Sequence, residues 1–232
     1  MSKYWKSVLR LEKNNHGRDF VCGDIHGCFD ELEHELKEFG FNKAQDRLFC
    51  VGDLIDRGPK SELAIEYIAS DWFFSVMGNH EWMFMMANTP GFPKRKDYLD
   101  THVNNGGDWA YEIRSIGIFP KNTRPILDAI RELPLVIQVG NVLIAHASLP
   151  AVESIEQIEE DPESYRKDIL WFRGEYRNVD IPGIDRVYVG HSIVREPKPS
   201  GKYLNIDTGA FMRYRGKEGE LTVMEIAPNQ AR

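Results

Sequence analysis

Three short polar blocks hold the residues of this chain that are best suited to chemistry. They are Gly23-Asp24-Ile25-His26-Gly27, Gly52-Asp53-Leu54-Ile55-Asp56-Arg57-Gly58 and Gly78-Asn79-His80-Glu81. Each block follows a short apolar run, over 19–22, 48–51 and 72–76, and precedes a segment with helical spacing. Three strands are therefore expected to carry acidic, imidazole, amide and guanidinium groups to one sheet edge, where open α/β sheets bind ligands.

The donor types in these blocks suit divalent metal ions. Carboxylate, imidazole and amide oxygen together favour Mn, Fe, Zn or Co, whereas Mg alone prefers more oxygen and fewer imidazoles. One carboxylate can bridge two ions, and a pair of ions about 3.5–4 Å apart suits in-line displacement at phosphorus. Arg57, just behind Asp53, supplies a forked cation that binds phosphate oxygens. The blocks predict a metallophosphoesterase with two divalent ions, of which we expect Mn, with Fe, Zn or Co as the alternatives.

The competing interpretation is that the blocks are glycine turns and capping aspartates without chemistry. The middle block alone matches five residue types, which chance would produce in a chain of this size with a likelihood on the order of 10⁻⁴. The first and third blocks, in order and each behind an apolar run, make chance a weaker explanation still.

The order of the blocks resembles the phosphoprotein phosphatase family of calcineurin-like metallophosphoesterases, and the short length resembles its bacterial and bacteriophage lambda phosphatase type. The resemblance covers nearly the whole chain from Asp19 to Ile226. It continues through Asn105-Gly106-Gly107-Asp108-Trp109, Leu133-Pro134-Leu135, Ala145-His146-Ala147, Trp171-Phe172-Arg173, Gly190-His191-Ser192 and Ile206-Asp207-Thr208-Gly209-Ala210. It implies an α/β fold, a two-sheet αββα sandwich with a dinuclear metal site at the carboxyl ends of the strands. One departure is Met77, where family members often carry arginine.

The resemblance also implies the metal ligands. Asp24, His26 and Asp53 would hold the first metal, and Asp53 would bridge to the second. Asn79, His146 and His191 would complete the second metal site. Asp207 would contact the ligands and not the metals. His146 and His191 each end a Val/Ile-rich strand just before a loop, as the three blocks do.

The catalytic roles follow from the same resemblance. A hydroxide that bridges the two ions would attack phosphorus directly, with no covalent enzyme intermediate. Arg57 and Arg173 would bind the phosphoryl oxygens, and Asn79 and His80 would also contact substrate. His80, oriented by Asp56, would protonate the leaving alkoxide.

The expected function is a serine/threonine protein phosphatase, with phosphotyrosine as a further substrate class. The alternative is a symmetrical dinucleoside tetraphosphate hydrolase, which would use the same metals and differ in its loops. A third hypothesis, a catalytically silent phosphate-binding protein, is disfavoured by the intact Arg57 and His80.

Length and composition indicate one soluble domain over residues 1–232. The chain is 42% apolar and 28% charged, with no run of 18 apolar residues, no apolar signal segment and an odd count of 3 cysteines. We therefore expect a cytoplasmic protein without a membrane partner or a disulfide framework. A net charge of −7 gives no footprint for nucleic acid, so a phosphoprotein or phosphopeptide is the expected partner, and monomer is the default.

The periodicity predicts a strand and turn in 1–18, helices over 29–39, 59–70, 80–86, 108–116 and 123–133, and a hairpin of 135–139 with 142–145. Pro90, Gly91 and Pro93 mark 89–107, including His102, as a surface loop. The segment 211–220, with Arg213, Arg215 and Lys217, is expected to be a mobile hairpin; the alternative is that it folds over the site and biases substrate choice.

Overall fold

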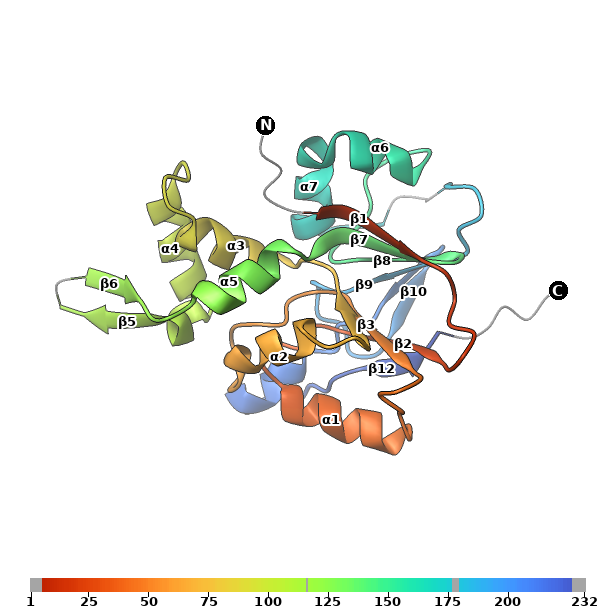
Figure 1. Ribbon diagram of the computed structural model, residues 1–232, viewed down its shortest axis with the longest axis horizontal. Helices are drawn as coiled ribbons and strands as arrows, with labels where there is room; N and C mark the ends of the chain where they lie inside the picture. The colour runs from red at the N-terminus through yellow and green to blue at the C-terminus, as the bar shows by residue number, and fades with distance from the viewer. Residues whose placement is uncertain (1–5, 116, 177–179, 227–232) are drawn as a thin grey trace.

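Two stacked β-sheets form the centre of the molecule (Figure 1). The computed structural model describes residues 6–115, 117–176 and 180–226. One sheet has the order β1-β7-β8-β9-β11-β10 and the other β12-β2-β3-β4, while β5 and β6 pair separately as a hairpin. The strands are β1 (Lys6–Leu11), β2 (Asp19–Cys22), β3 (Arg47–Cys50), β4 (Phe73–Ser75), β5 (Tyr111–Arg114), β6 (Gly117–Pro120), β7 (Pro134–Val139), β8 (Val142–Ala145), β9 (Arg186–Val189), β10 (Lys198–Ser200), β11 (Tyr203–Asn205) and β12 (Val223–Glu225).

Helices cover the outer faces of both sheets. Figure 1 shows α1 and α2 beside the four-stranded sheet, and α6 and α7 beside β1 and β7 of the six-stranded sheet. The helices are α1 (Phe29–Glu38), α2 (Ala64–Ile68), α3 (Asn79–Asn88), α4 (Arg95–Asn104), α5 (Arg124–Arg131), α6 (Ile155–Glu160) and α7 (Pro162–Trp171), with 3-10 turns η1 (Ser61–Leu63), η2 (Gly107–Ala110) and η3 (Ala210–Arg215). None of the helices in the described ranges has the length and apolar character needed to cross a membrane.

The alternation of side chains along the strands explains this layering. In β2, Phe20 and Cys22 pack into the core that includes Leu32 of α1, whereas Val21 packs into a second core. That second core contains residues of both sheets, such as Val21 from β2 and Ile144 from β8, so it lies between them. Because successive strand residues point to opposite faces, fully apolar strands bury both faces at once. The predicted two-sheet α/β sandwich is confirmed.

The expectation that 89–107 is a surface loop was wrong for much of its length. Residues Arg95–Asn104 form α4, which packs against α3. The sequence of α4 is polar and has no strong apolar stripe, so its pattern does not predict a helix. Packing against a neighbouring helix can stabilise such a segment. His102, assigned to the loop, is completely buried on this helix.

Two further element predictions need correction. Residues 108–116 were expected to be helical, but only the turn η2 is helical there, and Tyr111–Arg114 form β5, which pairs with β6. The segment 211–220 is not a hairpin: its first half continues η3, and its backbone folds back through a bond from Lys217 N–H to the Met212 carbonyl.

Candidate active site

Five strand ends meet at one place. β2, β3 and β4 are parallel neighbours, so the three blocks that follow them leave the four-stranded sheet at the same edge. β8 and β9 are likewise parallel, and they deliver His146 and His191 from the facing sheet. The side chains that gather there are all buried: Asp24, His26, Asp53, Asp56, Asn79, His80, His146 and His191.

The backbone at this site is held in an uncommon conformation. Among the described residues, six non-glycine residues have positive φ, and five of them are predicted site residues: His26, Asp53, Asp56, Arg57 and His191. Side chains with a Cβ adopt this left-handed region only at a cost of about 1–3 kcal/mol each. Surrounding contacts must therefore hold these turns in place.

Glu81 provides one such contact. Its carboxylate accepts hydrogen bonds from the backbone N–H of Asp53 at 2.9 Å, Leu54 at 2.8 Å and Ile55 at 3.3 Å, and from Gly78 at 2.9 Å. The third block is thereby fastened to the second. A Cβ on Gly78 would lie 2.1 Å from Oδ1 of Asp53, so this close approach requires glycine. No pattern in the sequence predicted this role of Glu81.

One cluster of metal-ligand atoms forms around His146. Its Nδ1 bonds to the Val51 carbonyl at 2.9 Å, which leaves the Nε2 lone pair free of a proton. That Nε2 lies 2.9 Å from Oδ1 of Asn79 and 3.2 Å from Nδ1 of His191, and 3.5 Å from Oδ1 of Asp53. Four potential ligand atoms thus converge on one point, an arrangement that a divalent cation stabilises, so these residues fit the second predicted metal position.

A second cluster forms on the other side of Asp53. Nε2 of His26 lies 3.5 Å and Nε2 of His80 lies 3.9 Å from Oδ2 of Asp53, while Nδ1 of His26 donates to the Ile55 carbonyl at 2.8 Å. The two carboxylate oxygens of Asp53 thus face different clusters, as a bridging ligand requires. Asp24 lies outside both tight groups and instead accepts a bond from the His191 N–H at 3.2 Å.

Electrostatics in the site favour bound cations. Burial lowers the pKa values of His26, His146 and His191, the last to about 3, so these imidazoles are neutral and can act as ligands at pH 7. Burial opposes the charge on Asp53, but the positive charge that His146, His80 and His26 acquire in acid, together with the permanent charge of Arg57, holds the pKa of its carboxyl well below the usual range. Burial, with Asp207 and Asp53 nearby, raises the pKa of Asp24, and a divalent ion would relieve that crowding of negative charge.

His80 belongs to a buried hydrogen-bond network. Its Nδ1 lies 2.6 Å from Oδ2 of Asp56, and its Nε2 has no partner among the described residues. Asp56 is also 3.0 Å from Nε2 of His102 and accepts a 2.7 Å bond from the Trp109 indole. His102 in turn bonds to the Tyr111 hydroxyl at 3.0 Å. The Asp56–His80 pairing was predicted, whereas the support from His102, Trp109 and Tyr111 was not.

The clusters open into a pocket of about 400 Å³. It is lined by Arg57, Asn104, Asn105, Arg173, His191, Ile193, Phe211 and Arg215. Arg57 lies at its base, with Nη1 2.6 Å from Nε2 of His26. The structure therefore brings both predicted phosphate-binding arginines, Arg57 and Arg173, to the mouth of the metal-ligand clusters.

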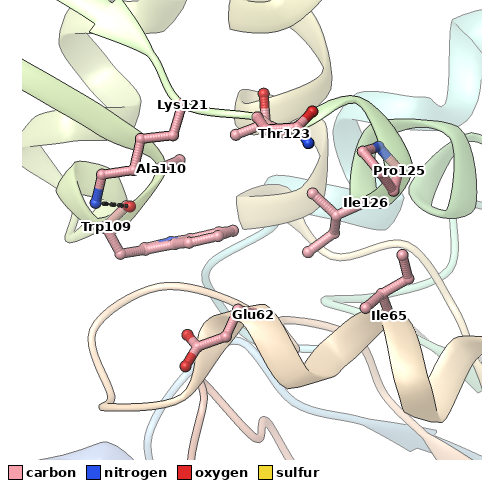
Figure 2. Close-up of a pocket in the computed structure, with 9 residues that line it drawn as sticks. Glu62, Ile65, Trp109, Ala110, Lys121, Thr123, Pro125 and Ile126 are labelled. Atoms are coloured by element: carbon pink, nitrogen blue, oxygen red, sulfur yellow. Dashed lines mark hydrogen bonds between the residues drawn. The ribbon is translucent and has the colours of Figure 1, made fainter.

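A larger pocket of about 560 Å³ is lined by residues of α2, η2 and α5, with Trp109 among them (Figure 2). Ile65, Pro125 and Ile126 give it apolar walls, and Glu62 and Lys121 lie at its edges. It is linked to the clusters through the indole of Trp109, which bonds to Asp56. None of the predicted metal ligands lines this pocket, so the smaller pocket is the candidate active site.

Comparison with known proteins agrees with this geometry. The profile of the calcineurin-like phosphoesterase family matches residues 20–199. The chain is 33% identical over 223 residues to serine/threonine-protein phosphatase 1 of Salmonella typhimurium, covering 94% of this chain and 95% of that protein. It is 32% identical over 133 residues to the symmetrical bis(5'-nucleosyl)-tetraphosphatase of Neisseria meningitidis, covering 56% of this chain and 43% of that protein. A crystal structure provisionally identified as a diadenosine tetraphosphatase superposes with a TM-score of 0.65 at 22% identity, covering 96% and 94% of the two chains.

Proposed function

Because the chain belongs to the calcineurin-like phosphoesterase family, we propose that this metal-dependent phosphoesterase acts as a serine/threonine protein phosphatase, with phosphotyrosine as a further substrate class. The observation that carries the choice of substrate is the match to a bacterial serine/threonine phosphatase, which extends over nearly the full length of both chains. The match to the tetraphosphatase covers less than half of that enzyme. This difference in coverage favours a protein phosphatase over a tetraphosphatase.

The buried His and Asp clusters suit two divalent ions. His26 and Asp53 would hold one, with Asp24, which lies outside the tight group, as the third predicted ligand. Asp53, Asn79, His146 and His191 would hold the other, with Mn as the proposed metal and Fe, Zn or Co as alternatives. When bound, such ions activate water and neutralise charge on phosphate oxygens. His80 is close enough to His26 and Asp53 to be an additional ligand, which makes its role the one to test.

The protein groups around the clusters have separate tasks. Arg57 and Arg173 would bind the equatorial oxygens of the phosphoryl group, since both line the pocket that opens over the clusters. His80 would give a proton to the leaving alkoxide from Nε2, which has no other partner among the described residues. Asp56 holds Nδ1 of His80 and stabilises the protonated ring.

A direct comparison of substrates tests the proposal. Protein stripped of metal with a chelator should bind about two Mn ions per chain, as measured by titration calorimetry. The Mn-loaded protein should then hydrolyse p-nitrophenyl phosphate. Its kcat/KM for a phosphoserine peptide should exceed that for diadenosine tetraphosphate. The opposite ratio would assign the protein to the tetraphosphatases, and activity that is indifferent to chelator would refute the metal scheme.

A further inference from the structure

The turn η3 is built into the mouth of the active site. Its first aromatic residue, Phe211, is 4% exposed and meets the ring of His26 edge-on at 5.0 Å between centroids. The segment is held in place at both ends, because Thr208 bonds through its hydroxyl to the Glu220 carbonyl and Tyr214 donates to Glu31 of α1 at 2.7 Å. A segment fixed in this way can present side chains to a substrate at a defined position.

The ring of Phe211 contacts two guanidinium groups. Arg57 is 4.7 Å and Arg215 is 5.0 Å from its ring centroid. Both contacts are within the range of cation–π attraction, so the ring holds Arg215 at a set distance from the phosphate-binding Arg57. Arg215 itself is exposed, and among the described residues no carboxylate lies within ion-pair distance of it.

Three arginines line this pocket, one more than the two assigned to the phosphoryl group. Arg57, Arg173 and Arg215 all line it, and no acidic side chain is among its lining residues. Arg213, two residues earlier, lines a different pocket together with Asp30, Glu31 and Glu35. The turn therefore sends one arginine toward the active site and one toward the acidic face of α1.

We propose that Arg215 binds a second anionic group of the substrate, next to the phosphoryl group that is cleaved. This inference rests on the proposed function in one respect: Arg57 and Arg173 are taken to bind the phosphoryl group that is cleaved. In a phosphopeptide the second group is the carboxylate of a flanking Asp or Glu, and in a dinucleotide it is a neighbouring phosphate of the chain. Arg215 is thus a specificity-determining residue, and Phe211 is the residue that positions it.

Arg215→Met tests this, because it removes the charge and keeps much of the length of the side chain. Three substrates are compared: p-nitrophenyl phosphate, a phosphoserine peptide flanked by glutamates, and the same peptide flanked by glutamines. The Mn-loaded wild type should prefer the glutamate peptide by about three- to tenfold in kcat/KM, and salt should weaken the preference. Arg215→Met should abolish the preference, whereas the matched control Arg213→Met should retain it.

Diadenosine tetraphosphate separates the two sources of the second anion. If Arg215→Met lowers its kcat/KM relative to p-nitrophenyl phosphate and leaves the two peptides unchanged, the second group is a phosphate and the peptide source is overturned. The inference is wrong if Arg215→Met and Arg213→Met have the same kcat/KM values on all four substrates. It is also wrong if Arg215→Met lowers kcat/KM for p-nitrophenyl phosphate as much as for the peptides and the tetraphosphate. If the wild type hydrolyses neither peptide, the proposed function is refuted. The role of Arg215 would still be tested by comparing wild type and Arg215→Met in kcat/KM for diadenosine tetraphosphate relative to p-nitrophenyl phosphate.

Discussion

Nε2 of His102 lies 3.0 Å from the carboxylate of Asp56, although the two residues are 46 positions apart in the sequence. Both side chains are completely buried, and the opposite side of Asp56 receives Nδ1 of His80 at 2.6 Å. Burial opposes the charge on Asp56, but His102 and His80 hold the pKa of its carboxyl well below the usual range. His102 is thus a positioning residue that keeps Asp56 ionised and oriented toward the proposed proton donor.

Replacing His102 tests this relationship. We expect His102→Leu to lower kcat for p-nitrophenyl phosphate by about tenfold, because Asp56 loses a buried donor. His102→Gln can still donate an amide N–H and should recover much of the rate. Metal content, measured by elemental analysis, should stay at the wild-type value in both variants, and the pH profile of kcat should change only for His102→Leu. Equal losses in the two variants would mean that His102 only fills space.

His80→Asn separates a proton donor from a metal ligand. As the proposed donor, His80 should contribute about 10²–10⁴ to kcat, while the two ions remain bound. The measurement is kcat together with metal content on the same preparation. A substrate with a good leaving group needs less protonation, so p-nitrophenyl phosphate should suffer less than a phosphoserine peptide. Loss of one ion per chain would make His80 a ligand, as its 3.9 Å distance from Oδ2 of Asp53 also permits.

The sequence was informative where one local motif carried both the chemistry and its position. Each block places its ligands directly after an apolar strand, so parallel pairing of β2, β3 and β4 was enough to bring Asp24, Asp53 and Asn79 to one edge. Long-range polar contacts leave no such signal. The bonds of Asp56 to His102 and Trp109 join segments about fifty residues apart, and neither partner has a periodicity or spacing that points to the other.

The segment after Gly209 shows a second limit of the sequence. Its sequence, with Arg213, Arg215 and Lys217, predicted a mobile hairpin. What orders the segment is a set of tertiary contacts, chiefly Phe211 with His26 and Tyr214 with Glu31. Each of these joins residues more than 180 positions apart, so composition alone could not reveal them.

The metal-free protein should lose stability in mild acid. Folding lowers the pKa values of the buried His26, His146 and His191, whereas in the unfolded chain they return to about 6.5. Below pH 6.5 the unfolded state therefore binds more protons, and the free energy of unfolding falls as pH falls, by up to about 1.4 kcal/mol per pH unit for each histidine. For His191 this loss continues toward its folded pKa of about 3.

Thermal melts in the presence of chelator measure this effect. The melting temperature should decline from pH 7 to pH 5, and His191→Gln should make that decline shallower. His34 is exposed on α1, so His34→Gln is the matched control and should leave the slope unchanged. A slope that is the same for all three proteins would show that the buried imidazoles do not control acid stability.

Glu81→Gln should damage both stability and metal binding. The glutamate carboxylate accepts four backbone N–H groups, two on each oxygen, and an amide keeps only one of the two acceptors. The –NH₂ group would then face two buried N–H donors, at a cost of about 2–4 kcal/mol in the free energy of unfolding. Since those N–H groups hold the strained turn of Asp53, Mn affinity should fall as well, measured by calorimetry. Glu62→Gln, at an exposed glutamate of η1, provides the matched control and should change neither quantity; a Glu81→Gln protein with wild-type Mn affinity would show that the second block keeps its shape without this carboxylate.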